Sequence, residues 1–207
     1  MEQGKHTYKI LQEIPRQIAE DNGIEFATSE CRCNDDATAI SLDFIGDSII
    51  ARWDIDEYFP TWQVYNYGVS GAGIDYIEGN AGRFAGKQVV VTIGTNNIND
   101  MVPERIEKYT ERYMSAIEGL GASRVYLYSL HPRNFSSDRS DVNTEVADFN
   151  DRIRTRVSEV PSIVYLDIYS DFIYKGEPNP QLYYDRLHLI PYGYEILVSA
   201  LKKALGM

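Results

Sequence analysis

The sequence predicts an α/β fold in which a parallel sheet is covered by helices on both faces. Two observations lead to this prediction: five short apolar runs rich in Val, Ile, Leu and Tyr recur from about residue 40, and a helix-length segment of mixed polarity follows each of them. Such alternation is typical of parallel sheets, because a crossover helix returns the chain to the same edge. A chain of 207 residues is long enough to bury this core in one domain.

The elements can be assigned in chain order. The predicted strands are Ala39–Ile45, Gln63–Tyr67, Gln88–Ile93, Arg124–Ser129 and Ile163–Asp167. The predicted helices are Ile49–Tyr58, Ile74–Arg83, Pro103–Leu120, Asp141–Val160 and Pro191–Leu205. Pro103 and Pro191 suit the first turn of a helix, where a backbone N–H is not needed. Ligands of such sheets bind beyond the carboxyl ends of the strands, so we expect functional residues directly after them.

Residues 1–38 differ from the rest and are predicted to form an N-terminal extension before a single domain at residues 39–207. Apolar residues near helical spacing favour a short amphipathic helix that packs on the domain: Tyr8, Ile10, Leu11, Ile14 and Ile18. The segment lacks the continuous apolar core of a signal peptide, which predicts a cytoplasmic protein. No apolar run reaches the roughly 18–20 residues that a membrane helix requires.

Charge and cysteine content exclude other classes of protein. Lys and Arg number 20 against 31 Asp and Glu, a formal net charge of −11. Binding to a phosphate backbone needs clustered basic residues, so we expect no nucleic-acid partner. Cys31 and Cys33 stand one residue apart, where strand side chains point to opposite faces, which excludes a disulfide framework. Without a neighbouring histidine they are expected to be free thiols and not metal ligands.

A serine follows the first predicted strand, in the run Gly46-Asp47-Ser48. Ser48 would stand at the start of the next helix, where backbone N–H groups are unpaired and the helix dipole favours negative charge. From there it could attack a carbonyl carbon while its own N–H holds the oxyanion. The simpler alternative is that Asp47 or Ser48 only caps the helix.

Glycine and amide residues follow the second and third predicted strands. Gly68 and Gly71 allow a tight loop whose N–H groups can approach a ligand closely. After the third strand, the side-chain amide of Asn96 could join backbone donors on the same oxygen, or it could only fix the loop as an Asx turn.

Asp185 and His188 precede the final helix and stand three residues apart. Held in a loop, this spacing lets the carboxylate orient the imidazole, which would take the serine proton and return it to a leaving alcohol. His131 also follows a strand and competes for the role of base, although a lone histidine is more often structural. The third histidine, His6, lies in the N-terminal segment.

These blocks, in this order, resemble the SGNH hydrolases, the superfamily of GDSL-type esterases and lipases. The similarity covers about residues 40–205 and rests on four motifs: Gly46-Asp47-Ser48, Asn66-x-Gly68-x-Ser70-Gly71, Gly94-Thr95-Asn96 and Asp185-x-x-His188. The resemblance implies a flavodoxin-like three-layer α/β/α sandwich with strand order 2-1-3-4-5. It also implies ester hydrolysis without metal or cofactor.

For the site, the resemblance implies Ser48, Asp185 and His188 as the catalytic residues. It further implies an oxyanion hole made by the N–H groups of Ser48 and Gly71 and the side chain of Asn96. We therefore expect a serine esterase that removes small acyl groups, acetyl above all, from an alcohol through an acyl-enzyme.

The tyrosines around the histidine loop suit sugar contacts and favour an acetylated carbohydrate, or another small-molecule ester, over a lipid: Tyr183, Tyr184, Tyr192 and Tyr194. Two alternatives stay open. One is an acyltransferase with the same triad, in which a sugar hydroxyl replaces water. The other is a non-catalytic flavodoxin-like binding module that holds the phosphate of FMN at the same strand ends.

Overall fold

The computed structural model describes residues 40–207. The predictions made for residues 1–39, which include the N-terminal extension, its amphipathic helix, His6 and the two cysteines, lie outside the described residues.

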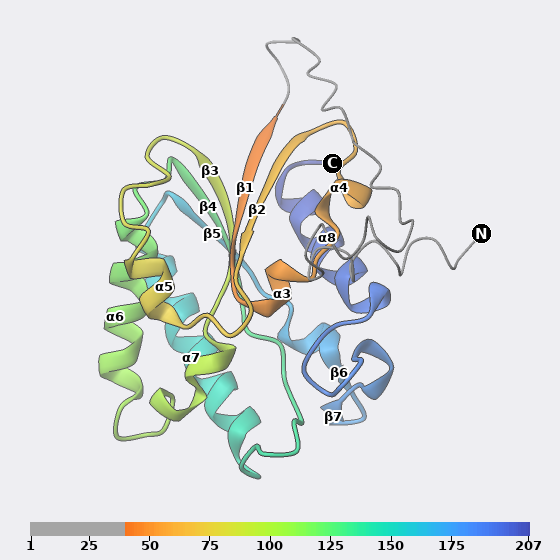
Figure 1. The fold of residues 1–207 in the computed structure, drawn as a ribbon. Coiled ribbons are helices and arrows are strands. Elements are labelled where there is room, and N and C mark those ends of the chain that lie inside the picture. Colours follow the sequence, from red (N-terminus) through yellow and green to blue (C-terminus); the bar gives the residue numbers. More distant parts are fainter. Residues whose placement is uncertain (1–39) are drawn as a thin grey trace, which may run out of the picture. The chain divides into compact units, whose positions relative to one another are not determined.

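The central sheet has five parallel strands in the order β2-β1-β3-β4-β5 (Figure 1). The strands are β1 (Ser41–Gly46), β2 (Gln63–Gly68), β3 (Gln88–Thr92), β4 (Arg124–Tyr128) and β5 (Ile163–Leu166). Each lies within two residues of its predicted bounds. Apolar runs mark β1, β3 and β4, which are almost entirely buried, whereas the residues of the edge strand β2 are exposed or half-buried. The predicted fold class and strand order are confirmed.

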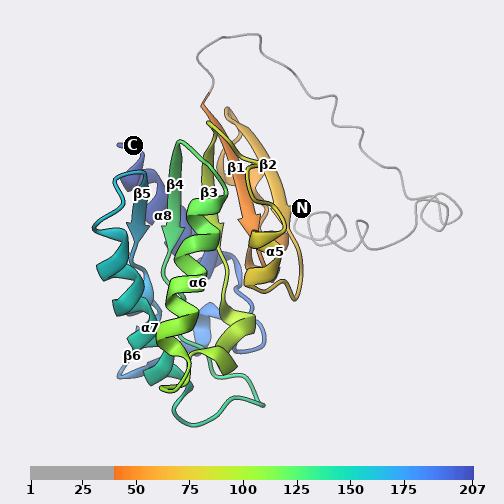
Figure 2. The ribbon, with the colours of Figure 1, turned by 90° about the vertical axis from the view of Figure 1, so that its left-hand side faces the viewer.

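Helices form a layer on each face of the sheet (Figures 1 and 2). One layer contains α5 (Ile74–Glu78), α6 (Ile106–Gly119) and α7 (Val142–Val157), and the other contains α3 (Ser48–Ala51), α4 (Ile55–Tyr58) and α8 (Pro191–Ala204). Alternate residues of β3 serve the two layers, since Val89 and Val91 belong to the core under α6 whereas Val90 belongs to the core under α8. The result is a three-layer sandwich with a core on each side of the sheet.

The helix predicted at Ile49–Tyr58 is wrong, because the structure has two short helices there, α3 and α4. Asn66 on β2 donates its side-chain N–H groups to the backbone carbonyls of Ile50 at 2.8 Å and Trp53 at 3.3 Å. These bonds hold the turn between α3 and α4, in which the N–H of Trp53 also donates to the carbonyl of Ile50, and Trp53, only 2% exposed, packs into the core. A contact from a neighbouring strand thus breaks a helix that local sequence favours.

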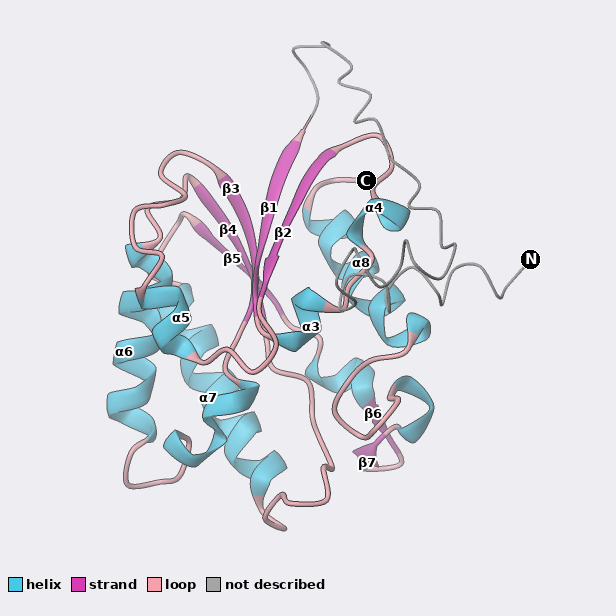
Figure 3. Ribbon diagram, in the orientation of Figure 1, coloured by secondary structure: helices cyan, strands magenta, loops and turns pink. Residues whose placement is uncertain are grey.

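Other helix ends also differ from prediction. The helix predicted to begin at Pro103 begins at Ile106, and the segment predicted to be helical to Arg83 is helical only to Glu78. Pro191 is the first residue of α8, as predicted. Several short elements were not predicted: 3-10 helices at Thr95–Asp100, Tyr169–Phe172 and Pro180–Leu182, and the antiparallel pair β6 (Ile173–Tyr174) and β7 (Glu177–Pro178) (Figure 3).

Within residues 40–207, every helix is too short or too polar to cross a lipid bilayer.

Candidate active site

Three loops leave the sheet side by side at its carboxyl edge. Gly46, the last residue of β1, pairs with Gly68 of β2 on one side and with Thr92 of β3 on the other. The strand order reverses at β1, because β2 lies on one side of it and β3, β4 and β5 lie on the other. Open α/β sheets bind ligands at such a switch point. Ser48 and Asn96 follow β1 and β3 at this edge.

Ser48 is the first residue of α3, and Asp47 caps the helix. One oxygen of Asp47, Oδ1, accepts the backbone N–H of Ile49 at 2.9 Å. Because Asp47 fills the capping position, the hydroxyl of Ser48 is available for another contact.

That contact is with His188. The Oγ of Ser48 lies 3.0 Å from Nε2 of His188, and Nδ1 of the same ring lies 2.6 Å from Oδ2 of Asp185. The other carboxylate oxygen of Asp185 accepts the backbone N–H groups of His188 at 2.8 Å and Leu187 at 3.2 Å. The structure therefore brings together Ser48, His188 and Asp185, in the order hydroxyl, imidazole, carboxylate.

The surroundings of Asp185 favour its charged form. Partial burial by itself would raise the pKa of this carboxyl, but the hydrogen bonds from His188 and Leu187 outweigh burial and hold the pKa below its ordinary value. A carboxylate accepts a hydrogen bond, so the proton of a neutral His188 ring is on Nδ1, which donates to Asp185. Nε2 then carries no proton and can accept a hydrogen bond from the serine hydroxyl.

Two asparagines tie the loop after β3 to the loop after β2. The side-chain Nδ2 of Asn96 donates to the carbonyl of Ala72 at 2.8 Å, and Oδ1 of Asn97 accepts the N–H of Ile74 at 2.9 Å. A primary amide carries two N–H groups, so Asn96 keeps a second donor beyond its bond to Ala72. Asn96 itself is exposed to solvent.

The other two expected oxyanion donors are backbone groups. In the described part of the chain, the N–H groups of Ser48 and Gly71 donate to no protein acceptor. Gly71 has a φ of +81°, a conformation that would strain any residue with a side chain. Unpaired N–H groups at a strand end are what a developing negative charge requires.

His131, the competing histidine, has different contacts. Its Nδ1 lies 3.0 Å from the carbonyl oxygen of Pro132, and its ring packs against Phe172 and Tyr183 at centroid distances of 5.3 and 5.5 Å. Burial lowers the pKa of His131 to about 4. It is therefore a neutral ring in the core, and His188 is the histidine that contacts the Ser48 hydroxyl.

The four tyrosines expected to contact sugar divide into two pairs. Tyr183 and Tyr194 are buried, and their hydroxyls donate to the carbonyls of Pro132 and Ile49. Tyr184 and Tyr192 are 80% and 68% exposed, so only these two are open to a ligand.

Sequence reasoning missed Arg133, which lies next to the expected site residues. Its guanidinium is buried and donates to Thr95, the residue directly before Asn96, and to Asp138. The sole signal was an arginine placed two residues after His131 beyond a strand end.

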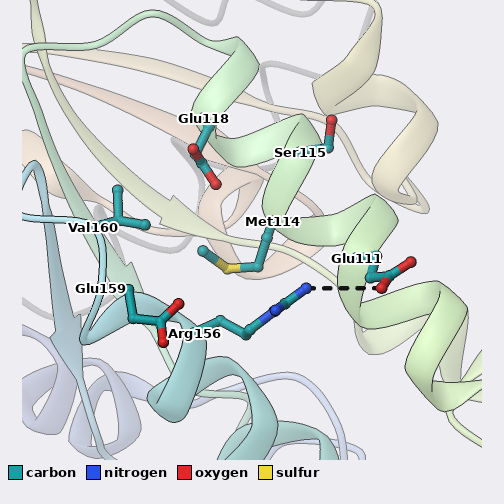
Figure 4. A pocket seen from close by; sticks show the side chains of 7 residues that line it. All are labelled: Glu111, Met114, Ser115, Glu118, Arg156, Glu159 and Val160. Carbon is teal, nitrogen blue, oxygen red and sulfur yellow. Dashed lines mark ion pairs between the residues drawn. The ribbon is translucent and has the colours of Figure 1, made fainter.

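A separate hollow of about 480 Å³ lies between α6 and α7 (Figure 4). Its lining consists of Glu111, Met114, Ser115, Glu118, Arg156, Glu159 and Val160, with Arg156 and Glu111 forming an ion pair at 3.9 Å. None of the residues expected to act on a substrate lines it. Residues 40–207 contain no cluster of three or more His, Cys, Asp or Glu side chains that could hold a metal ion.

Comparisons with known proteins identify the family and the fold. The model of the GDSL-like lipase/acylhydrolase family matches residues 44–196. No curated protein sequence matches the chain. Solved structures with the same fold include a GDSL-like lipase from Bacteroides thetaiotaomicron, 21% identical with a TM-score of 0.66, over 80% of this chain and 87% of that one. An acetylxylan esterase from Geobacillus stearothermophilus is 17% identical with a TM-score of 0.58, over 81% of this chain and 94% of that one.

Proposed function

The chain belongs to the GDSL-like lipase/acylhydrolase family, and from this membership we propose that it is a serine esterase that hydrolyses small acyl esters through an acyl-enzyme. We further propose that the acyl group is acetyl and that the alcohol is a carbohydrate. The coarser conclusion, hydrolysis of an ester, follows from the family alone.

One observation supports the mechanism more than any other. The 3.0 Å contact between Ser48 Oγ and His188 Nε2 continues into the 2.6 Å contact between His188 Nδ1 and Asp185. A serine hydroxyl is a weak nucleophile at neutral pH, and a neighbouring base oriented by a carboxylate is the arrangement that activates it.

In the first step, Nε2 of His188 removes the hydroxyl proton while Oγ of Ser48 attacks the ester carbonyl carbon. The carbonyl oxygen becomes an oxyanion, which accepts hydrogen bonds from the N–H groups of Ser48 and Gly71 and from the Asn96 amide. Collapse of this intermediate breaks the bond to the leaving oxygen, which takes the proton from His188 and departs as the alcohol.

The second step reverses the roles with water. His188 removes a proton from a water molecule, whose oxygen attacks the acyl carbon bound to Ser48. The serine oxygen then leaves and regains the proton, and a carboxylic acid is released. Asp185 stays ionised throughout, which agrees with its lowered pKa, and it stabilises the positive charge that His188 carries in each intermediate.

Two observations support an acetylated carbohydrate as the substrate. Tyr184, directly before Asp185 in the histidine loop, is 80% exposed, and Tyr192 at the start of α8 is 68% exposed. Exposed aromatic rings near a site are suited to stacking on sugar rings. A solved structure with the same fold is an acetylxylan esterase.

The proposal is tested with p-nitrophenyl esters of increasing chain length and with acetylated xylan. We expect the highest kcat/KM with the acetyl ester and release of free acetate from the xylan. Incubation with a slowly deacylating ester should add one acyl group to Ser48, detectable by peptide mass spectrometry. Transfer of the acetyl group to an added sugar, with no release of free acetate, would instead identify an acyltransferase.

Ser48→Ala should abolish turnover and acylation while the far-ultraviolet circular dichroism spectrum stays unchanged. Its matched control is Ser115→Ala, an exposed serine on α6, which should keep full activity. Near-normal ester cleavage by Ser48→Ala would end the serine mechanism.

A further inference from the structure

The loop between β4 and α7 contains a buried arginine that is bonded in two directions. Nη1 of Arg133 donates to the carbonyl oxygen of Thr95 at 2.6 Å and to its hydroxyl at 3.0 Å. Nε and Nη2 of the same guanidinium donate to the two oxygens of Asp138, each at 2.8 Å. The side chains of Arg133 and Asp138 are only 7% and 4% exposed, so this is an ion pair withdrawn from water.

A buried ion pair needs a reason beyond stability. Removing both charges from water costs free energy that their attraction only partly returns, and apolar residues of similar size would often serve the fold as well. What the guanidinium adds is direction, because its rigid fork fixes the groups that it contacts. Here the group fixed is Thr95, the residue directly before Asn96.

The backbone of Arg133 is held as firmly as its side chain. Asn143 on α7 accepts the N–H of Arg133 at 2.8 Å and donates to its carbonyl at 2.7 Å. Arg133 is therefore anchored to a long helix on one side and to the loop after β3 on the other. Such an anchor restricts the 3-10 helix Thr95–Asp100 at its first residue.

The same loop also contacts the histidine loop. The hydroxyl of Tyr183 donates to the carbonyl of Pro132 at 2.6 Å, and the N–H of Asn134 donates to the carbonyl of Arg186 at 3.1 Å. The residues on both sides of Arg133 thus bind the segment that contains Asp185 and His188. One loop connects the loop that bears the amide to the loop that bears the base.

We propose that Arg133, held by Asp138, is a positioning residue that fixes Asn96 through Thr95 for stabilisation of the oxyanion. This inference rests on the proposed function, because it requires Asn96 to bind the oxyanion. Arg133 itself touches no reacting atom. Its loss should therefore lower kcat and leave KM almost unchanged, since the donor it positions acts only on the charge of the transition state.

The test is a double-mutant cycle on p-nitrophenyl acetate. Asn96→Ala should lower kcat by about 10²–10³-fold, and Arg133→Met should lower it by about 10–100-fold, the loss expected when a group is displaced by roughly 1 Å. The double variant should match Asn96→Ala within about two-fold, because a misplaced amide cannot be lost twice. Losses that multiply in the double variant would overturn the inference.

Two further variants separate positioning from general damage. Lys87→Met removes the partner of Asp43, a carboxylate that is 2% exposed and pairs with Lys87 at 3.2 Å at the opposite end of the sheet. It should lower the melting temperature and leave kcat unchanged, and an equal loss of kcat in this control would contradict the proposal. Arg133→Lys keeps the positive charge beside Asp138 but lacks the planar fork of the guanidinium. It should fold and still have a lower kcat than the wild type. When Asn96 is already alanine, the same substitution should lower kcat no further.

The two proposals fail differently. An unchanged kcat in Asn96→Ala would remove Asn96 from the oxyanion hole, whatever Arg133 does. A large loss in Asn96→Ala together with a full kcat in Arg133→Met would refute only the positioning role.

Discussion

At the scale of single residues, Asp47 has two oxygens in different surroundings. Oδ1 caps α3, whereas Oδ2 is buried and has no hydrogen-bond partner among residues 40–207. Burial raises the pKa of Asp47 from its ordinary 3.8 to about 7, although the N–H of Ile49 and the charge of Arg133 oppose the rise. The residue before Ser48 is thus an acid that titrates near neutral pH.

This raised pKa has a defined effect on stability. Between pH 4 and 7 the folded state keeps a proton on Asp47 that the unfolded chain has lost, so the free energy of unfolding falls as the pH rises. Asp47→Asn removes this dependence. As the pH rises from 4 to 7, the free energy of unfolding of the variant should therefore increase relative to that of the wild type, by on the order of 4 kcal/mol in total. Urea unfolding of both proteins at several pH values measures the difference, and a constant difference would show that Asp47 is ionised at pH 4.

Mutation of His188 and mutation of His131 should affect activity very differently. His188→Ala should lose activity by several orders of magnitude, because His188 is the base of the proposed triad and the members of such a triad act as a unit. His131→Phe preserves a ring between Phe172 and Tyr183 and should keep kcat within a few-fold. Steady-state kinetics on one ester measure both variants, and the reverse order of losses would make His131 the base.

His131 also has a stability signature. Its pKa of about 4 lies below the ordinary 6.5, so the unfolded chain binds a proton in this range before the folded state does. Stability contributed by the neutral ring is therefore lost as the pH falls from 6.5 towards 4. This trend is opposite in sign to that of Asp47, and His131→Phe should abolish it.

At the scale of elements, the position of α3 depends on a glycine of β2. A Cβ atom on Gly68 would lie 2.2 Å from the backbone nitrogen of Ala51 in α3. Gly68→Ala must therefore push the end of β2 away from the helix that begins with Ser48. We expect a loss of about 1–3 kcal/mol of stability together with reduced kcat.

Gly119→Ala is the matched control, because a Cβ there meets no atom within 4 Å at the end of α6. It should be neutral or slightly stabilising, since alanine favours a helix more than glycine does. Thermal unfolding and kcat of the two variants provide the test, and equal behaviour would mean that β2 and α3 are not in close contact in solution.

The strands could be predicted from sequence more closely than the helices, for a physical reason. A strand buried on both faces is defined by its own apolar residues, as the run Val89-Val90-Val91 in β3 illustrates. The break after α3 depends on Asn66, a residue more than ten positions away, and no local pattern reports such a contact. The position at which a helix ends is therefore determined partly by contacts with distant residues, which the local sequence does not show.

The same distinction applies to the candidate site. Ser48 and Asn96 could be selected because each follows a strand, and Asp185 and His188 because they stand three residues apart before the final helix. All four belong to motifs. Arg133 belongs to none, and its role depends on Thr95 and Asp138 coming together around it. Residues that position others are defined by distant contacts and are the part that sequence reasoning misses.

At the scale of the whole molecule, the net charge of −11 should influence which esters reach the site. The field of an acidic protein repels an anionic ester at low ionic strength, and salt screens it, as the Debye length falls from about 30 Å at 0.01 M to about 8 Å at 0.15 M. For an acetyl ester that carries a carboxylate, kcat/KM should rise several-fold over this range while kcat changes little. A neutral acetyl ester is the control, and an equal rise with both would assign the effect to something other than charge.

The contact between Ser48 and His188 joins residues that are 140 positions apart in the chain. A ribosome that adds about 5–20 residues per second needs roughly 7–28 s to travel from one to the other. At the start of that interval the nascent polypeptide contains only β1, and the other four strands are added before His188 is reached. Throughout the interval it contains Ser48 without the proposed base. Under the proposed mechanism, hydrolytic activity therefore requires a chain that extends past His188, and a chain released earlier by a stalled ribosome would be harmless to the esters around it.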